Sequence, residues 1–374
     1  MKNQTEIYRP HSFDKPLLFI TLLLLAIGLI MVLSTTAIRA GEIYHQPFYF
    51  FLNQAIGAIL GLIFLFIIIS QRSPFYQNPL FIFGLLLLSF LLLGLCLLMP
   101  AFRHTHRWVY FFGLRFQPSE LAKFSLIFFL AYYLSKRPDR LGNIKTFLIP
   151  LVTIGVFVLL IIREPDYGTA FFIFLLAVII LFIGGIPLTH LIGLGLCLMP
   201  LFVLFLVKVD YRLNRIIALL FPGEDPLGKG FQLIQSKLAI GAGGILGVSL
   251  GESVQKLYFL PCAHTDFIYA IIGEELGLIG TLSILGLFIL FLWRGIIISL
   301  KAPNNYSQLL AAGISLAIFF QAVMNISIVL GLIPPTGLPL PFISFGRSSL
   351  VVNLMATGIL LHISQRRSGD RKQR

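Results

Sequence analysis

Charged residues are scarce in this 374-residue chain, at 11% of the total, whereas a soluble domain carries roughly 25%. Only 15 residues are acidic, while 57% are hydrophobic and the mean hydropathy is +0.93. This balance excludes an ordinary soluble domain. Apolar runs of roughly 18 residues or more recur along the whole length, which predicts an all-α polytopic membrane protein. An outer-membrane barrel would show short alternating segments instead.

Cysteine is also rare, and the three residues present cannot all pair. Cys96 and Cys197 lie in apolar runs, whereas Cys262 lies in a polar loop. The sequence therefore indicates neither a disulfide framework nor a cysteine-ligated metal. It also lacks a soluble domain, a low-complexity linker and a clear internal repeat. We expect residues 1–374 to form a single membrane domain.

The apolar runs predict about ten transmembrane helices. They cover residues 17–37, 48–70, 80–99, 119–135, 146–162, 168–184, 187–207, 265–293, 306–331 and 345–363. An even number places both termini on one side, and lysine and arginine are concentrated in the short loops and tails of that side. The positive-inside rule therefore predicts cytoplasmic termini, with 364–374 as a basic tail against anionic lipid. Residues 208–264 then form one large extracytoplasmic loop.

This outer loop carries its own predicted structure. Residues 211–221 predict an amphipathic interfacial helix that places Arg212 and Arg215 on one face. Residues 231–240, which include Lys237, are compatible with a second helix. The glycine-rich run 241–247 predicts a flexible backbone able to approach a ligand closely.

Asp266 is the acid that most requires an explanation, because it lies where the polar loop meets an apolar run. A carboxylate at a membrane boundary is expensive unless it has a task or a partner. One interpretation is that it caps the eighth helix by accepting a backbone N–H. The other is that it acts as a general base beneath a basic loop. The residues alone leave both open.

Other acids at membrane depth have simpler interpretations. Glu274 and Glu275 lie further along the eighth helix, where we expect internal hydrogen bonds in helix packing. Glu120 and Lys123 share a helical face, either as a mutually neutralising pair or as the lining of a polar cavity. Asp166 is placed to cap the sixth span.

Several separate motifs, in order along nearly the whole chain, resemble the SEDS family of shape, elongation, division and sporulation proteins, which includes FtsW and RodA. They are Arg107-Trp108 with Gln117-Pro-Ser-Glu-Leu-Ala-Lys123; Pro165-Asp166-Tyr-Gly-Thr-Ala170; Tyr211-Arg212 with Arg215; Gln235-Ser236; Leu260-Pro261 with Ala263-His-Thr-Asp-Phe-Ile268; Glu274-Glu-Leu-Gly-Leu-Ile-Gly280; and Gly337-Leu-Pro-Leu-Pro-Phe-Ile-Ser344 with Ser348-Ser349.

The resemblance implies a glycosyltransferase that polymerises lipid II into peptidoglycan outside the bacterial cytoplasmic membrane. It places the family's essential aspartate on Asp266. It also implies a class B penicillin-binding protein as partner (an FtsI-like transpeptidase), other divisome membrane proteins, and a divalent cation such as Mg²⁺ or Mn²⁺ with no visible ligand set. No nucleic acid is expected. The residues expected to contact substrate are Arg212, Arg215, Lys237, Lys256, Glu120, Lys123, Trp108 and Ser344.

The sequence around Gln255-Lys256 and Ala263-His264 resembles the division branch, FtsW, more than the elongation branch, RodA. Septal wall synthesis is therefore expected, with an elongation polymerase as the alternative. The chain departs from the family pattern twice: Cys262 stands where glutamate is usual, and Arg347 where a second glycine is usual. Two other functions stay open, a lipid II flippase and a non-catalytic scaffold for the division machinery.

Overall fold

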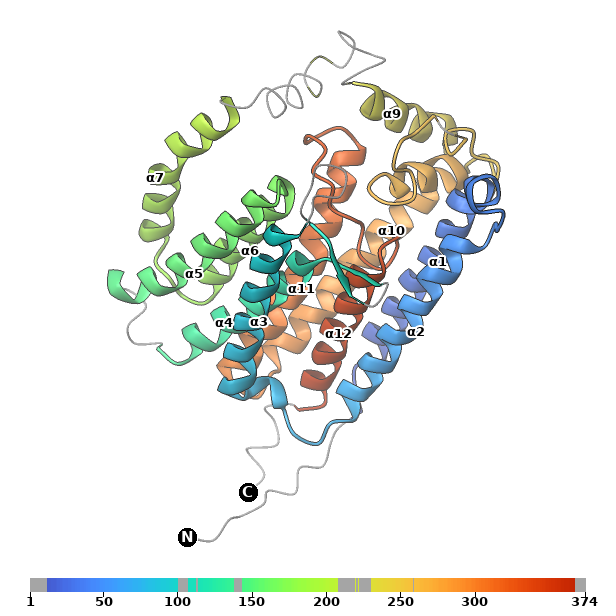
Figure 1. Ribbon diagram of the computed structural model, residues 1–374. Coiled ribbons are helices and arrows are strands. Elements are labelled where there is room, and N and C mark those ends of the chain that lie inside the picture. The colour runs from blue at the N-terminus through green and yellow to red at the C-terminus, as the bar shows by residue number, and fades with distance from the viewer. Residues whose placement is uncertain are drawn as a thin grey trace.

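The computed structural model describes residues 12–99, 107–111, 114–137, 143–207, 219, 221, 230–257 and 259–366. Its helices follow the predicted spans (Figure 1). They are α1 (Lys15–Tyr44), α2 (Tyr49–Ser70), α3 (Pro79–Leu98), α4 (Pro118–Ser135), α5 (Ile144–Arg163), α6 (Tyr167–Ile183), α7 (Leu188–Val207), α10 (Ile268–Leu300), α11 (Asn305–Val329) and α12 (Arg347–Ser364). The predicted all-α membrane fold is confirmed.

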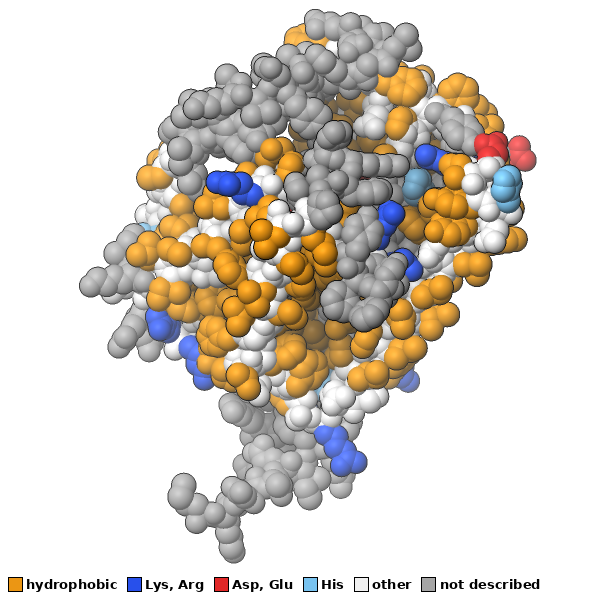
Figure 2. All heavy atoms as spheres, in the orientation of Figure 1, with side chains coloured by type: hydrophobic (Ala, Val, Ile, Leu, Met, Phe, Trp, Pro, Cys, Tyr) orange, Lys and Arg blue, Asp and Glu red, His pale blue; other side chains and the backbone are white. Residues whose placement is uncertain are grey.

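Seven of these helices are long and apolar enough to cross a membrane: α1, α2, α3, α5, α10, α11 and α12. The helix α6 is apolar but shorter, as is the described part of α7. The helix α4 carries the Glu120–Lys123 pair and is buried along nearly its whole length. Large apolar side chains are exposed on the outer helices, and Figure 2 shows hydrophobic groups across much of the described surface. Such a surface suits contact with lipid.

The start of α1 and the end of α12 meet at one end of the bundle. The backbone N–H of Asp14 donates to Ser364 Oγ at 2.9 Å, and the Asp14 carboxylate accepts from Arg294 Nε at 3.2 Å. Asp14 also caps α1 by accepting from Leu17 N at 3.0 Å. Both ends of the membrane domain therefore lie on the same side, as an even number of spans requires.

Small residues allow α2 and α12 to pack closely. A Cβ on Gly61 would stand 2.5 Å from Leu354 Cδ1, and a Cβ on Gly358 would stand 3.0 Å from Leu65 Cα. Gly57, one turn before Gly61, lies against Arg347 at the start of α12. This Gly-x-x-x-Gly spacing is typical of helix pairs in membranes, because backbones can approach where side chains are absent. This spacing was not among the features predicted from the sequence.

The outer loop contains the helix α9 (Phe231–Gly243), as predicted for 231–240. The following glycines do not form a free flexible segment. The backbone of Val248 and Ser249 donates to the carbonyls of Glu274 and Glu275, at 3.0 and 3.2 Å. The glycines allow the loop to approach the backbone of α10 closely. Loop amides there replace the backbone N–H groups that a continuous helix would provide.

The helix α10 is broken at the point where this loop docks. Gly277 has φ +64°, and the N–H groups of Leu278 and Ile279 donate to the carbonyls of Gly244 and Ile245. Only glycine adopts this backbone conformation without strain. The loop and the two halves of α10 therefore share one hydrogen-bond network.

Two features lie outside the expectations. Strands β1 (Val109–Phe111) and β2 (Leu114–Phe116) pair antiparallel between α3 and α4, and no strand was predicted there. The predicted interfacial helix 211–221 with Arg212 and Arg215, and most of the basic tail 364–374, fall outside the described residues.

We predict that Gly277→Ala lowers the melting temperature of the detergent-solubilised protein. The added Cβ would stand 2.4 Å from Gly247 N, and the backbone strain alone costs about 1–3 kcal/mol. Gly286→Ala is the matched control in the same helix, because a Cβ there meets nothing within 4 Å. Equal melting temperatures for the two variants would show that the break does not need glycine.

Candidate active site

The segment containing Asp266 is held by its backbone. Three successive carbonyls each accept a hydrogen bond from the C-terminal part of the chain: His264 from Phe345 N at 2.9 Å, Thr265 from Ser344 Oγ at 2.6 Å, and Asp266 from Asn325 Nδ2 at 2.8 Å. We call these three bonds the carbonyl clamp. It fixes the main chain of Asp266 while the residue stays partly exposed.

The capping interpretation of Asp266 is wrong. The helix α10 begins at Ile268, its N-cap residue is Phe267, and no side chain caps it. The preceding turn is instead organised by the carbonyl of Cys262, which accepts from Thr265 N, Thr265 Oγ1 and Phe267 N. Cys262 has φ +57° and an exposed side chain, and its carbonyl organises this turn.

His264 packs against two aromatic rings beside this turn. Its ring centroid lies 5.4 Å from that of Phe50 and 5.9 Å from that of Phe345. Burial, reinforced by the positive charge of Arg39, lowers the pKa of His264 to about 4. The imidazole is therefore neutral near pH 7, so His264 adds no charge beside the Asp266 carboxylate.

Arg107 brings a positive charge close to the carboxylate. A Cβ on Gly337 would stand 3.8 Å from both Arg107 Nη1 and Asp266 Oδ2, so both charged groups lie beside this exposed glycine. Arg107 Nη1 also lies 3.8 Å from Asp166 Oδ1, and its Nη2 donates to the carbonyl of Pro165. Trp108, the next residue, is half-buried.

Asp166 caps α6, as predicted. Its Oδ1 accepts from Thr169 N at 3.3 Å, and its Oδ2 accepts from Gln117 Nε2 at 3.4 Å. The neighbouring Glu164 is fully buried, and neither carboxyl oxygen has a hydrogen-bond partner among the described residues. Burial, followed by the nearby charge of Asp166, raises the pKa of Glu164 to about 8. Glu164 is therefore mainly protonated at neutral pH.

Glu120 and Lys123 form the predicted neutralising pair, with Lys123 Nζ 2.8 Å from Glu120 Oε2. Lys123 also donates to Gln321 Oε1 at 2.6 Å, and Gln321 Nε2 donates to the carbonyl of Pro339 at 2.9 Å. Asn325 lies one turn along α11 and donates to the carbonyl of Leu338 at 2.8 Å. The pair is thus linked to the loop that carries the carbonyl clamp.

Lys256 is not a free cation of the outer loop. Its Nζ donates to Glu275 Oε1 at 2.8 Å, Gly251 O at 2.6 Å and Ser34 Oγ at 3.2 Å, and its side chain is only 5% exposed. All three N–H donors of the Lys256 ammonium group are used inside the protein, so Lys256 does not face a substrate. It would have to break these bonds to contact a substrate.

The internal roles expected for the two glutamates of α10 are confirmed. Glu274 accepts from Ser253 Oγ and from Val254 N, while Glu275 accepts from Lys256 and Ser34. These bonds tie the outer loop to α1 and α10.

Of the other two predicted substrate-contacting residues, Ser344 belongs to the clamp and Lys237 lies on α9. Ser344 is buried, and its hydroxyl is used in donating to Thr265 O and accepting from Leu340 N. It therefore positions the Asp266 segment. Lys237 is exposed on α9, and its Nζ and Cε lie close to Gly331, at the start of the loop that runs to Gly337.

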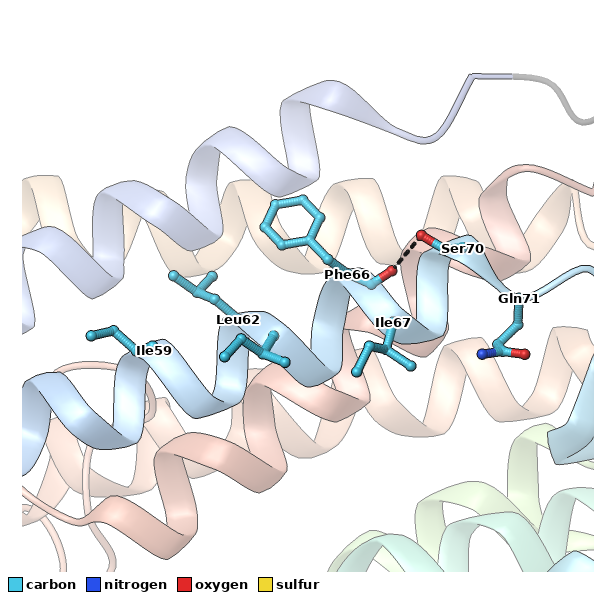
Figure 3. A pocket seen from close by; sticks show the side chains of 7 residues that line it. Ile59, Leu62, Phe66, Ile67, Ser70 and Gln71 are labelled. Atoms are coloured by element: carbon cyan, nitrogen blue, oxygen red, sulfur yellow. Dashed lines mark hydrogen bonds between the residues drawn. The ribbon is translucent and has the colours of Figure 1, made fainter.

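A groove lies elsewhere, along the exposed side of α2 (Figure 3). It has a volume of about 600 Å³ and is lined by Ile59, Leu62, Ile63, Phe66, Ile67, Ser70 and Gln71. Gln54, nearer the start of α2, contacts Ser344 O and Gly346 N. At about 1.5 Å per residue, the groove is centred roughly 15 Å along the helix from that contact. It is therefore not the Asp266 site.

We predict that Lys123→Met destabilises the protein by about 3–5 kcal/mol, because it leaves Glu120 buried without its cation. Adding Glu120→Gln removes the buried negative charge that has lost its partner. The double variant should therefore unfold at a higher temperature than Lys123→Met alone. Thermal unfolding in detergent measures both. A double variant less stable than the single one would contradict the ion-pair account.

Glu164 makes stability depend on pH. In the unfolded chain it ionises near pH 4.5, whereas in the folded protein it keeps its proton to about pH 8. Between these values the unfolded state binds fewer protons, so this residue lowers stability as pH rises. We predict that Glu164→Gln gains melting temperature relative to the wild type from about pH 5 to about pH 8. A difference independent of pH would contradict this assignment.

Comparison with known proteins places these features in a family. The FtsW/RodA/SpoVE family, described as cell cycle protein, matches residues 15–369. A probable peptidoglycan glycosyltransferase FtsW from Geobacter sulfurreducens is 40% identical over 377 residues, covering 98% of both chains. Stage V sporulation protein E from Bacillus subtilis is 41% identical over 358 residues, covering 95% of this chain and 97% of the relative.

Solved structures agree with the sequence relatives. A chain from a peptidoglycan synthase complex that coordinates polymerization and crosslinking superposes with a TM-score of 0.78 at 30% identity, covering 97% of this chain and 99% of the other. The rod shape determining protein RodA of Thermus thermophilus superposes with a TM-score of 0.70 at 27% identity, with the same coverage. The chain is a multi-pass membrane protein and belongs to the FtsW/RodA/SpoVE family, the SEDS family that its motifs resemble.

Proposed function

We propose that this protein is a peptidoglycan glycosyltransferase that polymerises lipid II at the outer face of the bacterial cytoplasmic membrane, for septal wall synthesis. One observation carries the proposal: Asp266 is partly exposed on a main chain fixed by the carbonyl clamp, and its carboxylate and Arg107 both lie beside Gly337. A catalytic base must be held in place and still reach its substrate. The names of the relatives supply the reaction class.

In the reaction, the C4 hydroxyl oxygen of an acceptor N-acetylglucosamine attacks C1 of a donor N-acetylmuramic acid. Asp266 takes the hydroxyl proton as the new C–O bond forms. The bond from C1 to the phosphate oxygen breaks, and polyprenyl pyrophosphate leaves with the electron pair. Such a leaving group is already anionic, so it gains more from nearby cations than from an acid.

The cations available to this leaving group are fewer than the sequence suggested. Lys237 is exposed above the loop that leads to Gly337, whereas Lys256 is paired inside the protein. Arg212 and Arg215 keep this role as proposals for the part of the outer loop outside the described residues. In the described chain no three His, Cys, Asp or Glu side chains are grouped as metal ligands. The described residues thus provide no set that fits a divalent cation, and we derive no step through one.

A lipid II flippase is the less favoured function. Transport would need polar groups free to line a path through the bundle, but Lys123 donates to both Glu120 and Gln321 in the interior. A polymerase also accounts for the partial exposure of Asp266.

We further propose a class B penicillin-binding protein, an FtsI-like transpeptidase, as the partner that crosslinks the product, with other divisome membrane proteins beside it. The structural relative from a complex that couples polymerization and crosslinking supports a partner of this kind. Cytoplasmic termini and a septal location complete the proposal, and the basic loops on the side of Asp14 and Ser364 support that orientation.

We predict that Asp266→Asn lowers the rate of lipid II polymerisation at least about 100-fold, because removal of a general base costs roughly 10²–10⁴ in rate. The assay uses purified full-length protein with its transpeptidase partner and labelled lipid II. Glu252→Gln is the matched control, since Glu252 is an exposed acid of the outer loop. A folded Asp266→Asn protein with full activity would overturn the assignment. Growth supported by Asp266→Ala would instead indicate a scaffold.

A further inference from the structure

Part of the outer loop exposes an apolar surface, although the sequence predicted that this loop lies in water. We call residues 244–251 the apolar segment. Its side chains Ile245, Leu246 and Leu250 are 67%, 79% and 55% exposed. No charged residue occurs between Lys237 and Glu252, so the whole segment is uncharged. A contiguous apolar patch of this kind marks a contact with lipid or with another protein.

The main chain of the apolar segment is bonded to α10 instead of to water. The N–H groups of Val248 and Ser249 donate to carbonyls of α10, at 3.0 and 3.2 Å. The carbonyls of Gly244 and Ile245 accept from amides of α10, at 2.9 and 3.3 Å. Irregular backbone is tolerated near the hydrocarbon of a membrane only where the protein satisfies its polar groups. These bonds satisfy the side of the segment that faces α10.

The length of α10 gives the depth of the apolar segment. Asp14 and Arg294 contact each other on the side of the membrane where both ends of the domain lie. The neighbouring Trp293 is exposed, as is typical of a membrane–water interface. Leu278, where the segment docks, lies sixteen residues before Arg294, or about 24 Å along the helix. Because a hydrocarbon core is about 30 Å thick, the segment lies at its far boundary.

The helix α1 gives a similar depth independently. Lys256, which follows the apolar segment, donates to Ser34 at 3.2 Å, and Figure 1 shows this loop beside the outer part of α1. Ser34 lies twenty residues after Asp14, or about 30 Å along the helix. The stacked rings of Tyr44 and Tyr49 lie farther out, at the end of α1. Tyrosine is enriched at membrane interfaces, so the loop contact lies no farther from the hydrocarbon than the interface does.

The apolar segment also continues an exposed apolar face of α10. Exposed side chains recur along this helix at intervals of four or seven residues, at Leu278, Leu282, Ile289 and Trp293. This spacing places them on one side of the helix. Since Leu278 N donates to Gly244 O, the segment extends that face at its outer end. The helix is long and apolar enough to cross a membrane, so lipid acyl chains fit the face and its extension alike.

We propose that the apolar segment inserts its side chains into the acyl boundary of the leaflet opposite the termini, which is the outer leaflet in the proposed orientation. Interfacial elements bind membranes in this way, with apolar groups about 5–10 Å into the boundary between headgroups and acyl chains. Lys237 and Glu252 mark where the chain returns to the headgroup layer. Part of the outer loop is then anchored in the membrane. This inference concerns the loop alone and does not depend on the proposed reaction.

The test measures what surrounds a nitroxide label on the full-length protein in nanodiscs of phosphatidylcholine and phosphatidylglycerol. Labels are attached at Leu246→Cys or Leu250→Cys, each in a background that replaces the native cysteines by Cys96→Ala, Cys197→Ser and Cys262→Ser. Molecular oxygen is concentrated among acyl chains, whereas a neutral nickel chelate stays in water. The rate at which each relaxes the label by collision therefore distinguishes lipid from water.

Two further labelled variants are the matched references. Leu290→Cys lies on the exposed side of α10, and Gln46→Cys lies in the exposed turn between α1 and α2. We expect the labels at Leu246 and Leu250 to lose nickel collisions relative to Gln46→Cys. Their oxygen-to-nickel ratio should match that of Leu290→Cys.

Two outcomes would overturn the insertion. Nickel collisions as frequent as those of Gln46→Cys would show that the apolar segment lies in water. Infrequent collisions with both oxygen and nickel would show that protein covers it, from this chain or from a second copy. Labels at two positions guard against a local effect of one substitution, and both have to report lipid for the proposal to stand.

Discussion

The carbonyl clamp is the constraint on which the candidate site depends. A carboxylate at the end of a helix has a mobile main chain unless something outside the helix holds it. Here the carbonyls of His264, Thr265 and Asp266 are held by donors far along the chain, from Asn325, Ser344 and Phe345. The loop that provides them is itself tied to α4 through Gln321 and Lys123. The buried ion pair of α4 and the exposed carboxylate therefore belong to one connected network.

The scarcity of acids in the sequence has a structural counterpart. Charges inside a membrane protein are tolerated when they are paired or hydrogen-bonded. Glu120, Glu275 and Asp14 each contact a cation, and Glu274 accepts from loop donors. Glu164 lacks a hydrogen-bond partner among the described residues and instead holds a proton. Against this background Asp266, ionisable and partly exposed, stands apart from the acids that serve only the fold.

Much of this arrangement was predictable from the sequence, and the failures have physical causes. Apolar run length predicts the spans well, because a helix must satisfy its own backbone in lipid. The i, i+3 spacing likewise predicted the Glu120–Lys123 pair. Local spacing carries no information about which distant residue meets a side chain. For that reason Lys256 was taken for a free cation, Ser344 for a substrate contact, and the glycines of 241–247 for a ligand-facing segment. The Gly-x-x-x-Gly spacing of Gly57 and Gly61 could have been recognised in the sequence as a helix-packing motif.

The break in α10 at Gly277 has a mechanical consequence. Amides of the outer loop replace helical partners at Glu274 and Glu275, while amides beyond the break donate back to Gly244 and Ile245. The loop is thereby hydrogen-bonded into the helix, and the stretch of α10 between Asp266 and the break shares its backbone bonds with the loop. A partner that bound this loop would therefore hold a segment whose backbone is bonded to the same helix that begins beside the Asp266 carboxylate.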